Sequence, residues 1–239
     1  MEKKKWYDIS VEDTVKILNT DLQNGLTSEE VTKRIEENGY NELIQKKKKT
    51  FLEKFLAQFK DFMIIVLIFA ALVSGIVGVL EHEGINDSII ILLIVIVNAI
   101  IGVMQENKAE KSLEALKKLS SHTAKVLRNG HLLVLPAREL VPGDVIILET
   151  GDYITADLRL TEAINLRIEE ASLTGESVPV EKITKLLAEE DLPLGDRENL
   201  AFSTSLVSYG RGKGIVVETG MNTEVGNIAT ILDSTENSQ

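Results

Sequence analysis

Two long runs of uncharged, mostly apolar residues restrict what this chain can fold into. The first covers residues 62–80 and the second residues 88–105, with a short acidic link between them. The 19 residues of the first run would extend about 28 Å as an α-helix, close to the hydrocarbon thickness of a bilayer. One alternative is a buried helix of a soluble protein. A signal peptide fits poorly, because the first run starts far from the N-terminus and a second run follows. The sequence therefore predicts a hairpin of two membrane-spanning helices.

Charged residues around the two runs predict the orientation of this hairpin. Lysines flank its outer ends at Lys46–Lys49, Lys108 and Lys111, whereas the link at residues 81–84 has none. Because Lys and Arg prefer the cytoplasmic side, the N-terminus and everything after the second run are expected in the cytoplasm. We therefore expect a multi-pass protein of the cell membrane, with the lipid bilayer as a partner. A formal net charge of −11 argues against nucleic acid as a partner.

Residues 1–50 carry the pattern of a small cytoplasmic helical segment. Ser10 can cap one helix, and Thr27 with Glu30 can form a capping box for a second helix that Gly39 ends. Two helices this short bury little surface by themselves, so we expect them to pack against a larger neighbour.

Residues 51–120 are expected to contain both spans and a stalk. The stretch 106–120 has no Gly or Pro and places apolar residues at helical spacing, which predicts that the second span continues beyond the membrane as one helix. Such a stalk can transmit motion between a soluble domain and the spans, or it can be a plain linker. Both interpretations stay open.

Short strand patterns fill residues 121–235. The dipeptide Asn129-Gly130 between two apolar runs predicts a tight β-hairpin. Further strand-like runs lie at 145–148, 166–168, 200–206 and 214–218, and a helical pattern follows at 223–232. The polar residues from 233 onward are expected to fray, with 236–239 as a tail outside the domain. Together these patterns predict a compact β-sandwich or jelly-roll-like domain. The fold class is thus mixed, an α-helical membrane hairpin with a cytoplasmic stalk plus a small all-β domain.

The candidate site is Thr174-Gly175-Glu176-Ser177, which sets one carboxylate on a tight turn. A capping box or an ordinary β-turn is the alternative explanation for these four residues. The chain has no cysteine, which excludes disulfides, thiolate metal sites and cysteine nucleophiles. His82, His122 and His131 lack the spacing of zinc ligands. We therefore expect no metal-binding and no cofactor-binding residues in this chain.

Several sequence blocks together resemble the type II cation pumps among the P-type ATPases, and most closely their calcium-pump branch. In chain order the blocks are residues 25–27 and 39–43, residues 97–106, Val141-Pro142-Gly143-Asp144, residues 151–152, residues 173–179 and residues 219–228. Each block is weak alone, but they follow the family order across nearly the whole chain. The resemblance implies that residues 121–235 form the actuator domain, a distorted jelly roll. It also implies that the hairpin is the first pair of membrane helices.

The same resemblance implies a catalytic role for Thr174, Gly175, Glu176 and Ser177. These pumps transfer phosphate from ATP to an aspartate and later hydrolyse the aspartyl phosphate. Glu176 is implied to orient and deprotonate the attacking water, and Thr174 with Gly175 to let the loop approach the phosphate. The whole pump would use ATP and Mg²⁺, neither bound by these residues. Its implied partners are the phosphorylation, nucleotide and remaining membrane domains of the same pump.

The transported cation is also a matter of resemblance. Ca²⁺ comes first, ahead of Na⁺, protons and Mn²⁺. The lack of any Cys-x-x-Cys argues against heavy-metal pumps, and Thr174 in place of an aspartate argues against lipid flippases. The chain departs from the family pattern at Lys60-Asp61, where an acidic pair is usual, at Thr155, where proline is usual, and at Thr204-Ser205, where Gly-Thr is usual.

The phosphorylated aspartate of the family, within Asp-Lys-Thr-Gly-Thr, does not occur in this sequence. We therefore expect a fragment of a pump that has no ATPase activity by itself. The alternative is a non-catalytic membrane scaffold or regulatory module, if the natural chain ends at Gln239.

Overall fold

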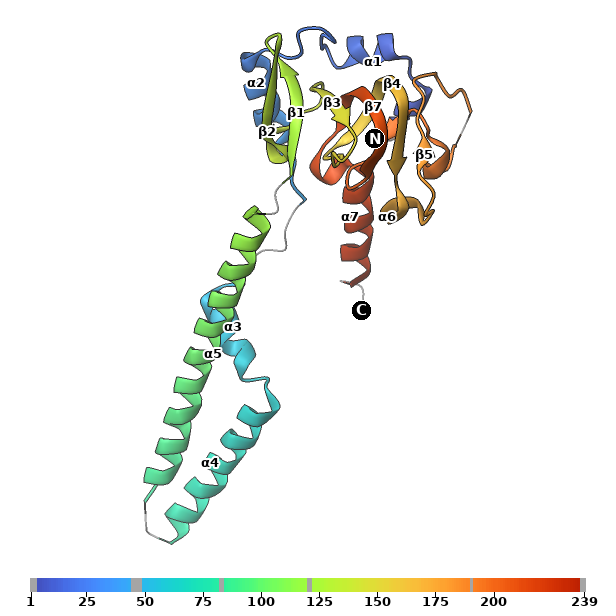
Figure 1. Cartoon of the computed structure of the whole chain (residues 1–239). Helices are drawn as coiled ribbons and strands as arrows, with labels where there is room; N and C mark the ends of the chain where they lie inside the picture. Colours follow the sequence, from blue (N-terminus) through green and yellow to red (C-terminus); the bar gives the residue numbers. More distant parts are fainter. Residues whose placement is uncertain (1–3, 44–48, 82–83, 120–121, 190, 237–239) are drawn as a thin grey trace. The chain divides into compact units, whose positions relative to one another are not determined.

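The computed structural model describes residues 4–43, 49–81, 84–119, 122–189 and 191–236 (Figure 1). They fall into two compact units. Met1–Ile44 and Ser121–Gln239 belong to one, called the β unit here, and Gln45–Ser120 to the other, called the helical unit. Residues 46–48 of the basic cluster, and residues 82 and 83 of the acidic link, lie outside the described residues.

In its described residues the helical unit contains three helices, namely α3 (Phe51–Gln58), α4 (Phe62–Leu80) and α5 (Asn86–Leu119). Thr50 and Glu53 form a capping box at the start of α3, and the carboxylate of Asp61 caps the first turn of α4. Helix α5 runs without interruption for 34 residues. The predicted continuation of the second span into a stalk helix is therefore confirmed for the backbone. The side chains of residues 114–119 lie outside the described part.

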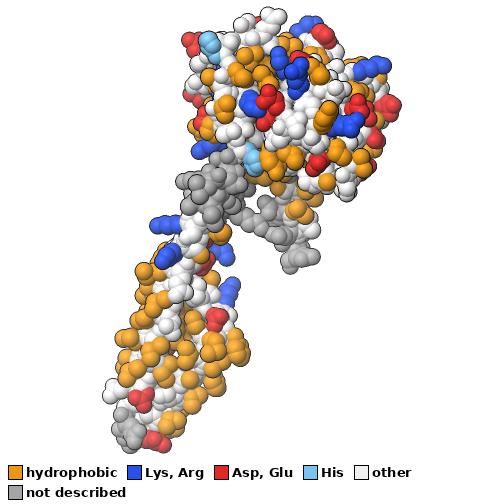
Figure 2. Space-filling model, viewed as in Figure 1, with side chains coloured by type: hydrophobic (Ala, Val, Ile, Leu, Met, Phe, Trp, Pro, Cys, Tyr) orange, Lys and Arg blue, Asp and Glu red, His pale blue; other side chains and the backbone are white. Residues whose placement is uncertain are grey.

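Apolar side chains of α4 and α5 are largely exposed. Phe62–Leu80 and Asn86–Leu113 are long and apolar enough to cross a membrane, and only 11% and 22% of their apolar windows are buried. Figure 2 shows hydrophobic side chains covering this unit along most of its length. A core helix of a soluble protein would be mostly buried, so this exposure disfavours that alternative. A bilayer is the solvent that suits such a surface.

Small residues let α4 and α5 approach each other closely. The Ser88 hydroxyl donates a hydrogen bond of 2.8 Å to the carbonyl oxygen of Ala71. A Cβ atom added at Gly75 would lie 3.0 Å from the Ser88 hydroxyl oxygen, and one at Gly78 would lie 2.0 Å from the carbonyl oxygen of Gly84. These small residues therefore account for the close packing of the two helices.

The first elements of the β unit are η1 (Trp6–Asp8), α1 (Val11–Ile17) and α2 (Ser28–Asn38). The side chains of Ser10 and Thr27 accept backbone N–H groups at the starts of α1 and α2, which confirms both predicted caps. The capping box predicted at Thr27 is only half formed, because the Glu30 carboxylate accepts hydrogen bonds from Arg34. Leu26 and Val31 pack with Val141 in one buried cluster. The expectation that these short helices pack against a larger neighbour is confirmed.

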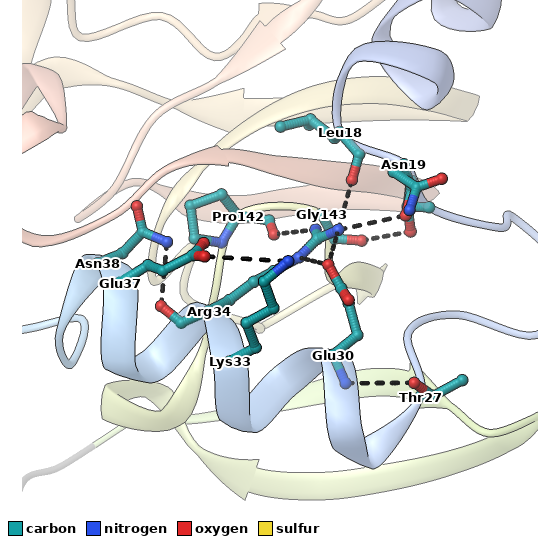
Figure 3. A network of polar contacts seen from close by, with 11 residues as sticks. Leu18, Asn19, Thr27, Glu30, Lys33, Arg34, Glu37, Asn38, Pro142 and Gly143 are labelled. Carbon is teal, nitrogen blue, oxygen red and sulfur yellow. Dashed lines mark hydrogen bonds and ion pairs between the residues drawn. The ribbon is translucent and has the colours of Figure 1, made fainter.

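Arg34 of α2 holds the N-terminal elements against the turn before β3. Its guanidinium donates hydrogen bonds to the carbonyl oxygens of Pro142 (2.6 Å), Leu18 (2.7 Å) and Asn19 (3.2 Å). It also donates two to the carboxylate of Glu30, at 2.9 and 3.0 Å (Figure 3). One buried cation thereby joins three separate segments of chain.

Asp144 forms a second buried contact at the same place. Its carboxylate accepts hydrogen bonds of 2.8 and 2.6 Å from Arg128 and a third, of 2.9 Å, from a backbone N–H. Gly143, which precedes Asp144 in the sequence, has φ +97°, and a Cβ there would lie 1.9 Å from an Arg34 guanidinium nitrogen. Arg34, Arg128 and Pro142–Asp144 are called the joint below.

Seven strands form one antiparallel sheet in the order β2-β1-β3-β7-β4-β5, with β6 paired to β4. They are β1 (Thr123–Arg128), β2 (His131–Pro136), β3 (Val145–Glu149), β4 (Asp157–Glu169), β5 (Val180–Glu181), β6 (Leu200–Ala201) and β7 (Leu206–Glu218). The β1–β2 hairpin turns at Asn129 and Gly130, both at positive φ, as the sequence predicted. The predicted mixed fold, apolar helices together with a β domain, is confirmed.

The main core of the β unit consists of alternate residues from the longer strands. Its fully buried members include Val126, Leu158, Leu160, Leu166, Ile168 and Val216. A second cluster packs Trp6 and Tyr7 against Leu200, Phe202 and Val217. Burying one such aliphatic side chain contributes about 1.5–3 kcal/mol, so these clusters hold the N-terminal segment to the sheet.

Two strand predictions were too short, and one was wrong. The runs at 166–168 and 214–218 are the ends of β4 and β7, which have 13 residues each. Register shifts within their pairing, for example between Leu160 and Glu162, interrupt the alternation of apolar residues. The run at 200–206 is not one strand, because the chain turns after β6 and holds Thr204 at φ +74° before β7 begins.

The end of the chain also differs from its prediction. Helix α7 (Glu224–Glu236) continues through residues 233–236, which were expected to fray. Hydroxyl groups of Ser234 and Thr235 both donate to the carbonyl oxygen of Ile231, within the last helical turns. Residues 237–239 of the predicted tail lie outside the described residues.

Candidate functional site

Thr174, Gly175, Glu176 and Ser177 lie where the short helix α6 (Ala171–Thr174) ends after β4. Gly175 has φ +77° and its N–H donates to the carbonyl oxygen of Ala171 at 3.0 Å. Glycine adopts this left-handed conformation at little cost, so it ends the helix. The capping-box alternative is ruled out, because Thr174 is the last residue of α6 and no helix starts within the described residues 175–189.

Thr174 fixes the backbone of the next residues. Its hydroxyl donates to the carbonyl oxygen of Glu170 at 3.1 Å and accepts from the N–H of Glu176 at 3.3 Å. The Glu176 side chain is exposed, and its carboxylate has no hydrogen bond or ion pair to any other described residue. Nothing lies within 4 Å of a Cβ added at Gly175. The backbone around Glu176 is thus held by hydrogen bonds, while its carboxylate is exposed and has no partner among the described residues.

Both ends of the segment that carries Glu176 are anchored. Strand β5 pairs with the end of β4, opposing Ile168 to Val180. Two residues after each of these in the sequence come Glu170 and Lys182. The Lys182 ammonium lies 2.7 Å from the Glu170 carboxylate, and both side chains are fully buried. Burial raises the pKa of Glu170 and lowers the pKa of Lys182, while the attraction between them opposes both shifts.

A neighbouring segment supports the other side of the loop. The short turn η3 (Leu194–Asp196) contacts α6, and a Cβ at Gly195 would lie 3.7 Å from the Thr174 methyl group and 4.0 Å from a Glu176 carboxylate oxygen. Leu173 and Leu194 both pack on the cluster around Phe202. The loop therefore rests on a packed base, while its tip at Val178 is 73% exposed.

Two parts of the sequence match known protein families. Residues 118–233 match the P-type ATPase actuator domain, and residues 6–74 match the cation transporter/ATPase N-terminus. The chain belongs to the P-type ATPase family.

Individual relatives agree with this assignment. The calcium-transporting ATPase 1 of Bacillus cereus is 48% identical over 95% of this chain and 26% of its own length. A calcium-transporting ATPase of Listeria monocytogenes is 50% identical over 91% of this chain and 24% of its own. The sodium/potassium exporting P-type ATPase 1 of Saccharomyces cerevisiae is 40% identical over 97% of this chain and 21% of its own. The chain spans about a quarter of the length of these curated relatives.

Within this actuator domain, sequence reasoning singled out the four loop residues but missed Glu170 and Lys182. Charged residues next to strand ends usually face solvent, and nothing local distinguishes these two. The available signal was their symmetry, since one acidic and one basic residue flank the two ends of the same loop. Among the described residues, no three His, Cys, Asp or Glu side chains group together as metal ligands.

Proposed function

We propose that these residues are the N-terminal part of an ATP-driven cation pump in which Glu176 promotes hydrolysis of an aspartyl-phosphate intermediate. In this proposal residues 1–50 are a cytoplasmic helical segment, residues 51–120 hold two membrane spans and the stalk, and residues 121–235 are the actuator domain. The pump lies in the cell membrane with its N-terminus and actuator domain in the cytoplasm, in accord with the lysines at 108 and 111.

The observation that carries this proposal is the exposed Glu176 carboxylate on its fixed loop. A general base needs a free carboxylate that can reach the water it deprotonates. As the water oxygen attacks phosphorus, the carboxylate takes its proton and the bond between phosphorus and the aspartate oxygen breaks. The products are inorganic phosphate and a free aspartate. Gly175 adds no side chain at the loop, so the backbone can approach a phosphate closely.

The site is assembled only when a second domain brings the phosphate to this loop. Thr174 and Ser177 flank Glu176 and complete the proposed site, and the exposed Val178 offers an apolar contact beside it. Hydrolysis would then occur only in the conformation that joins the two domains, and the α5 stalk would couple that conformation to gating of the ion path.

ATP, Mg²⁺ and the transported ion belong to the whole pump in this proposal. We assign the binding of ATP and Mg²⁺, and all chemistry they supply, to other domains of the pump, because the family's Asp-Lys-Thr-Gly-Thr motif does not occur in this sequence. Ca²⁺ is the proposed ion because the bacterial relatives are calcium-transporting ATPases. The yeast relative bears a sodium/potassium name, which makes Na⁺ the alternative to compare with it.

The test uses the full-length protein that contains these residues, in membrane vesicles. The Glu176→Gln variant should form the phosphoenzyme from ATP normally but lose it at least about 100-fold more slowly, the scale expected for a missing general base. Glu181→Gln is the matched control, because Glu181 is an exposed carboxylate at the other end of the same loop. Normal phosphoenzyme decay in Glu176→Gln would refute the role of Glu176. Comparing phosphorylation with Ca²⁺ and with Na⁺ tests the ion.

A further inference from the structure

We propose that the buried ion pair between Glu170 and Lys182 is a positioning element that holds the Glu176 loop in its active conformation. This inference rests on the proposed function of Glu176. It assigns a role in the reaction to two residues that do not themselves reach the reacting atoms.

The pair is buried among apolar side chains. Its ammonium and carboxylate lie 2.7 Å apart and both side chains are 0% exposed. The Lys182 nitrogen also lies 5.8 Å from the centre of the Phe202 ring, within the apolar cluster that supports the loop. In the described part of the chain, neither charged group has a hydrogen bond of good geometry to a third residue. Glu170 is the main partner of Lys182, and the negative charge of Glu198 adds a smaller attraction that also raises the pKa of Lys182.

Glu170 is linked to Glu176 by a short chain of hydrogen bonds. Its carbonyl oxygen accepts the N–H of Leu173 (2.9 Å), the N–H of Thr174 (3.0 Å) and the Thr174 hydroxyl (3.1 Å). The same Thr174 hydroxyl accepts the N–H of Glu176. A displacement of Glu170 thus passes through one residue to the backbone of the catalytic carboxylate.

Lys182 secures the other end of the loop. Its N–H donates to the carbonyl oxygen of Leu166 at 2.8 Å, directly after the β4–β5 pairing. With Glu170 and Lys182 in contact, the eleven residues 171–181 form a closed loop whose two ends have a fixed separation. Opposite charges that are buried without further hydrogen-bond partners are costly to separate, so the pair holds the two ends of the loop together.

Stability alone does not explain a charged pair at this position. Replacing a buried ion pair with apolar residues of similar volume is often neutral or stabilising, whereas removing one partner is strongly destabilising. The pair therefore has a use other than stability, and its place at the base of the loop points to positioning.

The deciding experiment measures phosphoenzyme decay in the full-length protein carrying Glu170→Leu and Lys182→Met together. We expect normal phosphoenzyme formation, an unfolding temperature within a few degrees of the parent, and decay at least about tenfold slower. Decay within twofold of the parent rate would overturn the proposal. If the double variant does not accumulate, Glu170→Gln with Lys182→Met gives the same readout, because it also removes both charges and keeps the shape of the Glu170 side chain.

A matched control separates positioning from general loss of stability. Asp144→Asn breaks the buried Asp144–Arg128 pair, which lies in the joint and not in the loop. This control should unfold at lower temperature, yet the phosphoenzyme it forms should decay at the parent rate. Slow decay in the control would also overturn the proposal, since any destabilisation would then suffice. Glu176→Gln is run alongside, because normal decay there refutes the proposed function itself, while slow decay there with a normal double variant refutes only the positioning role.

Discussion

The joint and the Glu176 loop belong to the same β unit but treat their polar groups in opposite ways. At the joint, Arg34 and Asp144 are buried, and their charged groups hold five and three hydrogen bonds respectively. At the loop, the Glu176 carboxylate is exposed and has no partner among the described residues. The charged groups of the joint are hydrogen-bonded within the β unit, whereas the Glu176 carboxylate of the loop is left accessible.

This difference separates residues that hold the unit together from the carboxylate that we propose to serve a reaction. A buried, fully bonded charge is costly to disturb because its partners are left buried and unpaired. An exposed carboxylate contributes little to stability, so it is free to be selected for chemistry. Substitutions at the joint should therefore lower the unfolding free energy more than substitutions of exposed charged residues, and a different outcome would contradict this comparison.

The largest stability effect is expected from Asp144→Ala. This change leaves Arg128 buried without its partner and should lower the unfolding free energy by about 3–5 kcal/mol. Trp6 is the single tryptophan of the chain and is buried in the β unit, so its fluorescence during denaturation reports this unit. The control Glu149→Ala removes an exposed partner of Lys125 and should cost less than about 1 kcal/mol. Equal losses in both variants would contradict the special status of the joint.

A smaller effect should distinguish two glycines with similar backbones. Gly143 and Gly151 have φ +97° and +93°, but only at Gly143 would an added Cβ meet Arg34, whereas at Gly151 it would meet nothing within 4 Å. Alanine at Gly151 should therefore cost about 1 kcal/mol of backbone strain. Alanine at Gly143 should cost about 1.5–3 kcal/mol more, because Arg34 loses charged hydrogen bonds. The Trp6 signal measures both, and equal costs would show that Arg34 simply moves aside.

The parts that local chemistry determines were predictable from the sequence. Ser10 and Thr27 cap helices, and Asn129-Gly130 turns a hairpin, because each acts on residues within a few positions of itself. The spans followed from their uninterrupted apolar runs. The four loop residues were found through a resemblance, and their catalytic role stays a prediction.

The parts that depend on distant segments were not predictable. The full length of β4 and β7 follows from their pairing with each other across register shifts, which no local pattern shows. Whether Glu170 and Lys182 face solvent or each other depends on Phe202 and the segments packed around it. From the sequence alone Arg34 would be expected on the exposed face of its helix, and only the fold brings the Pro142 carbonyl oxygen within hydrogen-bond distance of it.

The smallest change in unfolding free energy is expected near the loop, at Thr204, where the sequence departs from the family pattern. Thr204 stands where the family pattern usually has Gly. The structure holds Thr204 at φ +74°, a conformation that costs a β-branched residue about 1–2 kcal/mol. Thr204→Gly should remove this strain while giving up a hydroxyl contact of 3.4 Å with Ser172. Because glycine also gains freedom in the unfolded chain, we expect a net stabilisation of at most about 1 kcal/mol in the Trp6 denaturation assay.

Thr204→Ala is the matched control, since it loses the hydroxyl but keeps the strain, and it should not stabilise. If both variants destabilise equally, the Ser172 contact matters more than the strain, and the base of the loop depends on Thr204 as it depends on its ion pair.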